Sequence, residues 1–185
     1  MHGPAVLSVL LVLLTGATGT LCLLRLRGAR PAGAGAPRHG SRGSDAAEAA
    51  MGLGTAVMIT LGDRLPTPLW VVLFGLLGAG SLVAAAGPGG GRLRAHRLHH
   101  AVGSAAMVYM ALAMHGPDRH PGMAMPTGLP VLTGLLLLYF GCYALWSGSR
   151  LLTAAGPPAG PARGPVPQAC RLAMGVGMFA MLLAL

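Results

Sequence analysis

The stretch His99–His115, with the sequence HHAVGSAAMVYMALAMH, is an apolar segment that carries three imidazoles and three thioethers. On a helix, His100, Met107 and Met114 recur at intervals of seven residues, and Met110 falls on the same face. Soft sulfur and imidazole nitrogen atoms aligned on one face of an apolar helix favour a soft metal ion. The competing interpretation is that these methionines fill gaps between packed helices.

The composition around this stretch is that of a membrane protein. Of 185 residues, 54% are hydrophobic and 9% are charged, whereas about a quarter of the residues in a soluble domain are charged. The apolar residues form blocks long enough to cross a bilayer, which takes roughly 20 residues. All 13 basic residues are arginine and Ile59 is the single isoleucine, which indicates a GC-rich genome and an actinobacterial source. Such a genome disfavours the methionine codon, yet the chain contains 11 methionines.

We expect an all-α integral membrane protein with six transmembrane helices arranged as three helical hairpins. The apolar blocks place these helices at residues 4–24, 46–61, 68–86, 98–114, 129–150 and 169–185. The first block is too long for a signal peptide, and arginines follow it instead of a cleavage site. Residues 25–44 and 151–168 are rich in glycine, proline and alanine, which is typical of flexible loops. We therefore expect residues 1–185 to form a single transmembrane domain.

The arginines indicate the orientation, because cytoplasmic loops carry an excess of basic residues. Six spans with the amino terminus outside place eleven arginines on the cytoplasmic side: Arg25, Arg27, Arg30, Arg38, Arg42, Arg92, Arg94, Arg97, Arg150, Arg163 and Arg171. Only Arg64 and Arg119 remain outside. We therefore expect a multi-pass plasma-membrane protein with both termini outside. The net charge of +9 reflects this asymmetry and does not indicate nucleic-acid binding.

The methionines are confined to alternate helices. Three segments align without gaps, Met51–Met58, His100–Met107 and Met174–Met181, and each has a glycine at its fourth position and a methionine at its end. They lie in the second, fourth and sixth expected helices, and the other three contain no methionine apart from the initiator. We expect these three helices to form an inner bundle, with the others facing lipid. The neighbouring glycines allow close helix packing: Gly52, Gly54, Gly103, Gly175 and Gly177.

An internal repeat of this kind stacks the candidate metal ligands in two layers. The layers are Met51, His100 and Met174, and, about 10 Å farther outward, Met58, Met107 and Met181. Thioethers combined with an imidazole suit Cu(I). Further candidate ligands on the same helices are Met110, Met114 and Met178. The loop after the fourth helix adds four candidate ligands that are expected to capture copper: His115, His120, Met123 and Met125.

The carboxylate of Glu48 has two interpretations. Asp45 can cap the second helix, with Glu48 three residues later as in a capping box. If Glu48 lies deeper, a carboxylate inside the membrane that faces His100 indicates a functional site. Adjacent histidines on a helix point about 100° apart, so we expect His100 to face the bundle and His99 to anchor the helix. The three cysteines are far apart in the sequence and are expected to be packing residues.

This layout resembles an actinobacterial family of small polytopic membrane proteins, domain of unknown function 5134. The resemblance rests on histidine followed by spaced methionines, as in His99–Met114, and on the methionines of Met174–Met181. The second helix departs from the pattern, since Glu48 stands where the resemblance implies a histidine and Thr55 where it implies a methionine. The family implies no activity. The Met-x-x-x-Met spacing is also similar to that of a trimeric copper importer, which is an analogy of chemistry and not of fold.

The leading hypothesis is a Cu(I)-binding membrane protein that transports, stores or delivers copper. Its expected partners are the lipid bilayer and a copper donor or acceptor protein. One alternative is a non-catalytic scaffold or partner subunit with methionine-rich packing. A second alternative is a haem protein with His100 as an axial ligand. We expect no enzyme, because the sequence contains no nucleophile elbow, phosphate-binding glycine loop or zinc-protease helix.

Overall fold

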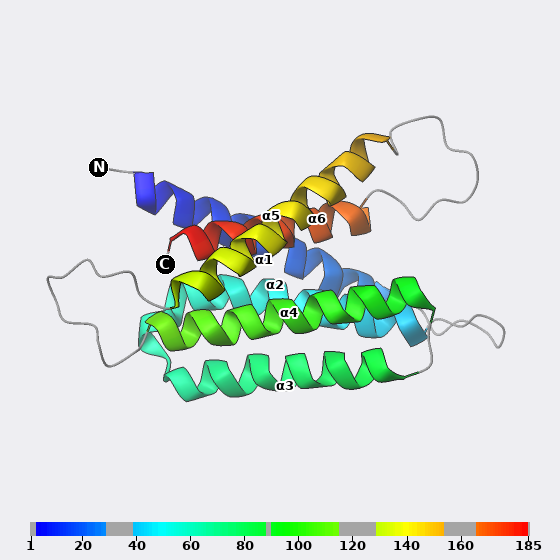
Figure 1. Ribbon diagram of the computed structural model, residues 1–185, viewed down its shortest axis with the longest axis horizontal. Helices are drawn as coiled ribbons and strands as arrows, with labels where there is room; N and C mark the ends of the chain where they lie inside the picture. Colours follow the sequence, from blue (N-terminus) through cyan, green and yellow to red (C-terminus); the bar gives the residue numbers. More distant parts are fainter. Residues whose placement is uncertain (1–2, 29–38, 88–89, 115–128, 154–165, 185) are drawn as a thin grey trace, which may run out of the picture. The chain divides into compact units, whose positions relative to one another are not determined.

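A computed structural model describes residues 3–28, 39–87, 90–114, 129–153 and 166–184. Within these ranges the chain forms six α-helices and no strand, as the sequence predicts (Figure 1). The helices are α1 (Gly3–Gly28), α2 (His39–Leu61), α3 (Thr67–Ala86), α4 (Gly91–Met114), α5 (Pro130–Thr153) and α6 (Val166–Leu183). A short 3-10 turn, η1 (Gly62–Arg64), joins α2 to α3.

Three of these helices are long and apolar enough to cross a membrane. They contain the segments Val6–Arg27 in α1, Thr67–Ala86 in α3 and Pro130–Leu152 in α5. These are the helices without methionine beyond the initiator, and each exposes many large apolar side chains. A chain with such surfaces has the character of a membrane protein.

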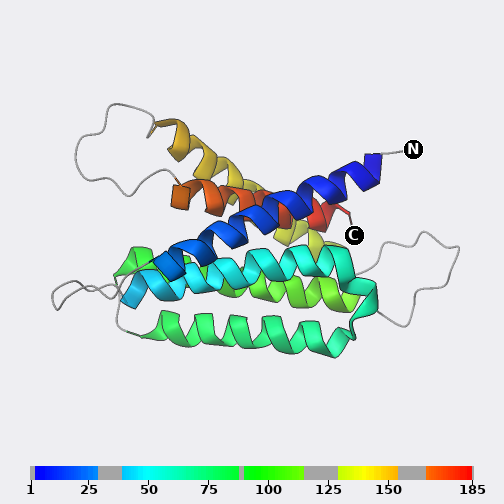
Figure 2. The same cartoon turned by 180° about the vertical axis from the view of Figure 1, so that it is seen from behind.

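The helices form two compact units. The first unit contains α1 to α4, and the second contains α5 and α6. In the first, α1 packs along α2 and α3 packs along α4, while α2 also contacts α4 and α3 (Figures 1 and 2). The unit is therefore built from two antiparallel hairpins that meet through α2 and α4.

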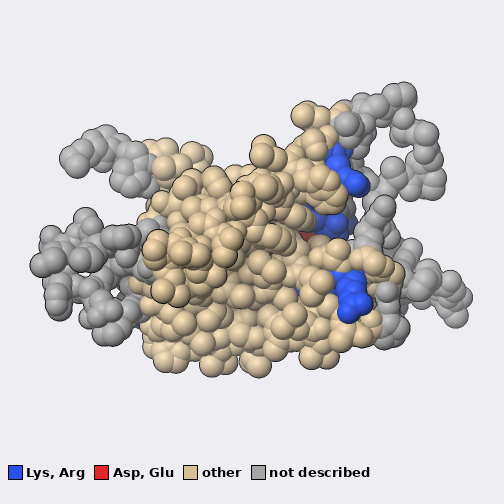
Figure 3. Space-filling model, viewed as in Figure 1, with Lys and Arg blue, Asp and Glu red and all other residues tan. Residues whose placement is uncertain are grey.

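Arginines mark one end of the first unit. Arg25 and Arg27 lie in the last turn of α1, and Arg94 and Arg97 lie near the start of α4, at the same end of the antiparallel hairpins. In the space-filling view, most of the described surface in view is uncharged (Figure 3). Arg64 lies at the opposite end, in η1.

Glycines bring α1 and α2 into close contact. A Cβ atom added to Gly52 would lie 2.9 Å from the carbonyl oxygen of Thr15 and 3.0 Å from Cα of Gly19. One added to Gly19 would lie 2.8 Å from the backbone nitrogen of Leu53. Backbones that approach this closely require residues without a side chain, as at other small-residue helix crossings in membranes. The contact fixes α2 against the more apolar α1.

The glycines beside the methionines do permit close packing, but mostly against the outer helices. Gly52 faces α1, Gly54 lies against the ring of Phe74 in α3, and Gly175 lies against the ring of Tyr143 in α5. Of those that face a neighbouring side chain, Gly103 alone lies between α4 and α2, where Met51 fills the space above it. Within the first unit, Met51, Met58, Met107 and Met110 are all buried, which agrees with the predicted inner position of α2 and α4.

The helices α2 and α4 each begin seven residues before the positions expected from the apolar blocks, at His39 and Gly91 instead of 46 and 98. The additional turns are rich in glycine, serine, arginine and histidine, so their composition alone does not predict a helix. Tertiary contacts override that weak propensity. As a consequence Glu48 lies inside α2, and the predicted capping box of Asp45 and Glu48 at a helix start is wrong.

Candidate metal centre

Two histidines of α4 and one glutamate of α2 meet inside the first unit. His96 and His100 are four residues apart and therefore share one face of α4. Their Nε2 atoms are 3.1 Å apart. Oε1 of Glu48 lies 3.2 Å from Nε2 of His96 and 4.0 Å from Nε2 of His100. Three potential metal-ligating atoms thus converge from two facing helices.

The nitrogen Nε2 of His96 is the centre of this convergence. Besides Glu48 and His100, the hydroxyl oxygen of Ser44 lies 2.6 Å from the same atom. A ring nitrogen offers either one N–H or one lone pair, so it cannot satisfy three polar partners with linear hydrogen bonds. Ligand atoms around a metal with bonds of about 2.0–2.2 Å lie about 3–3.6 Å apart. The distance between the two Nε2 atoms, 3.1 Å, and the distance from Oε1 of Glu48 to Nε2 of His96, 3.2 Å, both fit this range.

The cluster is almost completely removed from solvent. The side chains of Glu48, His96 and His100 are 2%, 8% and 3% exposed. A carboxylate buried to this degree requires a compensating positive charge or several hydrogen bonds. Imidazolium or a bound cation supplies that charge, whereas an apolar setting would not. A cation at this point would compensate the buried carboxylate.

Neighbouring side chains orient the ligands from outside. Cys22 of α1 donates a hydrogen bond to Oε2 of Glu48 over 3.5 Å, which leaves Oε1 directed toward the histidines. Arg97 of α4 donates to the carbonyl oxygen of Ala84 in α3. Such surrounding hydrogen bonds fix the rotamers of metal ligands in known sites. The α2 and α3 helices both contact α4, and α1 acts on the cluster through Glu48 of α2.

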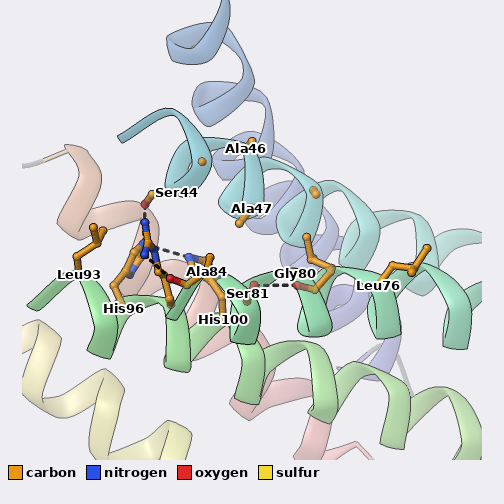
Figure 4. Close-up of a pocket in the computed structure, with 14 residues that line it drawn as sticks. Ser44, Ala46, Ala47, Leu76, Gly80, Ser81, Ala84, Leu93, His96 and His100 are labelled. Carbon is orange, nitrogen blue, oxygen red and sulfur yellow. Dashed lines mark hydrogen bonds between the residues drawn. The ribbon is translucent and has the colours of Figure 1, made fainter. Parts of the chain in front are cut away.

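A cavity of about 470 Å³ adjoins the cluster between α2, α3 and α4 (Figure 4). His96 and His100 form part of its wall, and Ser44 lies above His96 in this view. The opposite walls are largely alanine, glycine and leucine. A ligand in the cavity would therefore lie beside two of the three converging side chains.

Of the metal ligands predicted from the sequence, the structure places His100 in this cluster. The alternative interpretation of Glu48, as a buried carboxylate facing His100, is confirmed by its contacts. His99 is also buried, so the expectation that only one of the adjacent histidines turns inward is wrong. The ring centroids of His99 and His100 are 6.1 Å apart, and both fit because α4 is covered on more than one side.

The methionines of the first unit have other contacts. Thr55 donates a hydrogen bond to Sδ of Met107 over 3.8 Å, and Ser104 donates to Sδ of Met51 over 4.0 Å. These contacts cross between α2 and α4, one or more turns farther along the helices than Glu48 and His100. Met58 and Met110 are buried in the same two helices.

The remaining predicted ligands are outside the first unit or outside the described residues. Met174, Met178 and Met181 belong to α6 of the second unit. The side chain of Met114 and the whole of His115, His120, Met123 and Met125 lie outside the described part of the chain. The two predicted ligand layers each combine residues of both units, and they remain a prediction.

Sequence reasoning missed Ser44, Cys22 and His96. The spacing His96-x-x-x-His100 is a detectable signal for two ligands on one helix face. The spacing was not recognised because His96 lies between the expected helices 68–86 and 98–114, in a segment expected to be a loop. The contacts of Cys22 and Ser44 join residues 26 and 52 positions apart in the sequence, and no local pattern predicts them.

Comparisons with known proteins identify a family and no activity. The sequence profile described as domain of unknown function (DUF5134) matches residues 40–185, which includes α3 to α6 and almost all of α2. The predicted resemblance is therefore confirmed. Cys22 and the rest of α1 precede the matched region. No curated protein and no solved structure shows a significant match.

Proposed function

The chain belongs to the family of domain of unknown function 5134, and we propose that it binds one divalent transition-metal ion at Glu48, His96 and His100. The observation that carries this proposal is the approach of one carboxylate oxygen and two imidazole nitrogens whose side chains are nearly inaccessible to solvent. A metal ion would neutralise the buried carboxylate and use both ring lone pairs at once. The proposed role is binding of the ion and not catalysis.

The donor set favours a borderline divalent ion over a soft monovalent one. Imidazole suits zinc, iron, nickel and copper, and carboxylate adds preference for harder ions. Three protein ligands leave at least one coordination position for water or another ligand. Zn²⁺, Fe²⁺ and Mn²⁺ are therefore the ions to test first, and a site of this kind has no need of sulfur.

We place the site near the cytoplasmic face of the plasma membrane. The proposed topology has six membrane-crossing helices with both termini outside, which puts the arginine-rich end of α1 and α4 in the cytoplasm. Arg97 contacts Ala84, two residues before the end of α3. The ligands next to Arg97 would then lie about one helical turn inside the membrane boundary and be reachable from the cytoplasm.

Copper binding through methionine is a second candidate. The observation that favours it is the burial of four thioethers on α2 and α4, Met51, Met58, Met107 and Met110. In this form of the proposal the chain transports, stores or delivers Cu(I) and exchanges it with a donor or acceptor protein. The predicted copper layers share His100 with the Glu48 cluster and differ from it in every other residue, so the two candidates are separable by mutation of Glu48 and His96 or of the methionines.

The deciding experiment is metal analysis of detergent-purified protein after exposure to Zn²⁺, Fe²⁺, Mn²⁺ or Cu(I). The proposal expects about one divalent ion per chain, lost in Glu48→Gln and in His96→Asn, and retained when Met51 and Met107 are both replaced by leucine. Leucine conserves the volume of methionine, which makes the double variant a matched control.

Other results of the metal analysis would support the copper, haem or scaffold hypothesis instead. Copper that disappears in the Met51→Leu, Met107→Leu protein and persists in Glu48→Gln would overturn the Glu48 centre in favour of the methionine site. A visible absorption band would indicate haem. No bound metal in a folded protein would leave the scaffold hypothesis, with Glu48 neutralised by imidazolium.

A further inference from the structure

The cavity beside the metal cluster has one polar end and one apolar end. Ser44, His96, Arg97 and His100 form the polar end, and Leu76 and Leu77 belong to the apolar walls. Among the described residues that line it, none is acidic. The polar end therefore offers hydrogen-bond donors and positive charge, and the remainder offers a surface for hydrocarbon.

The cavity opens on the flank of a membrane helix. Leu76 is 69% exposed and Gly80 is exposed, and both line the cavity from α3. The α3 helix is one of the three that are apolar enough to cross a bilayer. Exposed apolar residues of such a helix face hydrocarbon, so a molecule that enters between α2 and α3 comes from the lipid phase.

The polar end lies at the depth of lipid headgroups. Arg97 and Ala84 are in contact only two residues before α3 ends, whereas Leu76 lies more than two turns deeper along the same helix. A guanidinium has five N–H donors, so its bond to Ala84 leaves donors for an oxyanion. The cavity has a cationic group near the membrane boundary and apolar walls deeper in the membrane. This arrangement is complementary to an anionic phospholipid, which has a charged headgroup and a hydrocarbon chain.

We propose that this cavity binds one hydrocarbon chain of an anionic phospholipid, whose phosphate contacts Arg97 and lies beside the Glu48–His96–His100 centre. The inference deepens the proposed function and rests on it for the metal ion and for the position in the membrane. Phosphate geometry matches the planar donors of arginine. A three-ligand metal centre with an open position would add a second contact for a phosphate oxygen.

Two glycines of α3 give a matched pair of variants. A Cβ atom at Gly80 or at Gly75 would meet nothing within 4 Å, so a side chain can begin at either position without a backbone clash. Gly80 lines the cavity and Gly75 does not. Gly80→Leu therefore fills the cavity, while Gly75→Leu adds the same side chain to the same helix outside it.

The test is native mass spectrometry of the delipidated, metal-loaded protein with phosphatidylglycerol or phosphatidylcholine added. We expect one tightly bound phosphatidylglycerol, at least about tenfold weaker binding of it in Gly80→Leu and in Arg97→Gln, and wild-type binding in Gly75→Leu. Equal binding in the Gly80→Leu and Gly75→Leu proteins would overturn the proposal. So would equal binding of both lipids, or a co-purified fatty acid or neutral isoprenoid in place of a phospholipid.

Metal content measured on the same samples tests the metal centre independently of the lipid site. Bound metal with no lipid preference would overturn the lipid site alone. Selective phosphatidylglycerol binding that depends on Gly80 and Arg97, in a protein without metal, would overturn the metal centre and leave the lipid site supported by Arg97.

Discussion

At the scale of single residues, His96 is the central ligand of the proposed metal site. Its Nε2 atom lies within 3.2 Å of an oxygen of Ser44, a nitrogen of His100 and an oxygen of Glu48. A metal ion and protons compete for the same two imidazole lone pairs, because only the neutral ring binds metal. Acidification therefore opposes binding at this site more strongly than at a site with one histidine.

The corresponding prediction concerns pH. The affinity for Zn²⁺ should fall steeply as the pH is lowered from 8 to 5, because protons displace the metal ion from its imidazole ligands. Competition titration with a zinc indicator between pH 8 and pH 5 measures this slope. An affinity that does not change over this range would contradict ligation by His96 and His100.

Cys22 gives a second prediction at this scale. Its thiol holds Oε2 of Glu48, and loss of such an outer hydrogen bond weakens metal sites by about 10–100-fold. Cys22→Ala should therefore raise the dissociation constant for the metal by that factor in the same titration. The control is Cys142→Ala, because Cys142 is exposed on α5. Equal affinity in the two variants would show that Cys22 has only a packing role.

At the scale of elements, the crossing of α1 and α2 brings two helix backbones into direct contact. A methyl group at Gly52 would meet backbone atoms of Thr15 and Gly19 at 2.9–3.1 Å, and backbone cannot move aside as a side chain does. Gly52→Ala should destabilise the protein by about 1–3 kcal/mol, measured as a lower midpoint of thermal unfolding followed by circular dichroism. Gly75→Ala, at an open position of α3, should not lower the midpoint, because alanine is the better helix former.

The helices were predictable from the sequence, and the site was predictable only in part. Blocks of apolar residues locate all six helices, and three of these helices are long and apolar enough to cross a membrane. The starts of α2 and α4 contain Ser44 and His96 in polar, glycine-rich sequence whose helical state depends on tertiary contact. His100 was found because it belongs to an apolar periodic pattern. The partners of Glu48 come from two other helices, α1 and α4, and sequence spacing does not encode contacts between helices.

At the scale of the whole molecule, the proposed orientation in the membrane rests on the placement of the arginines. Arg94 lies near the start of α4 and Arg64 in the turn between α2 and α3, at opposite ends of the first unit. Cysteine substituted at position 64 should react with a membrane-impermeant maleimide in intact cells, and cysteine at position 94 should react only after lysis. These substitutions should be made in a cysteine-free background with normal expression. The reverse pattern of labelling would invert the topology and move the metal centre to the outer face.

The central claim is that Glu48, His96 and His100 bind a divalent metal ion without sulfur. X-ray absorption spectroscopy of the metal-loaded protein tests it most directly, because nitrogen and oxygen ligands lie at about 2.0–2.2 Å from zinc and sulfur at about 2.3 Å. We predict a first coordination shell of nitrogen and oxygen only, with outer-shell scattering from two imidazole rings. Glu48→Gln should lose this coordination. A shell dominated by sulfur, or one unchanged in Glu48→Gln, would contradict it.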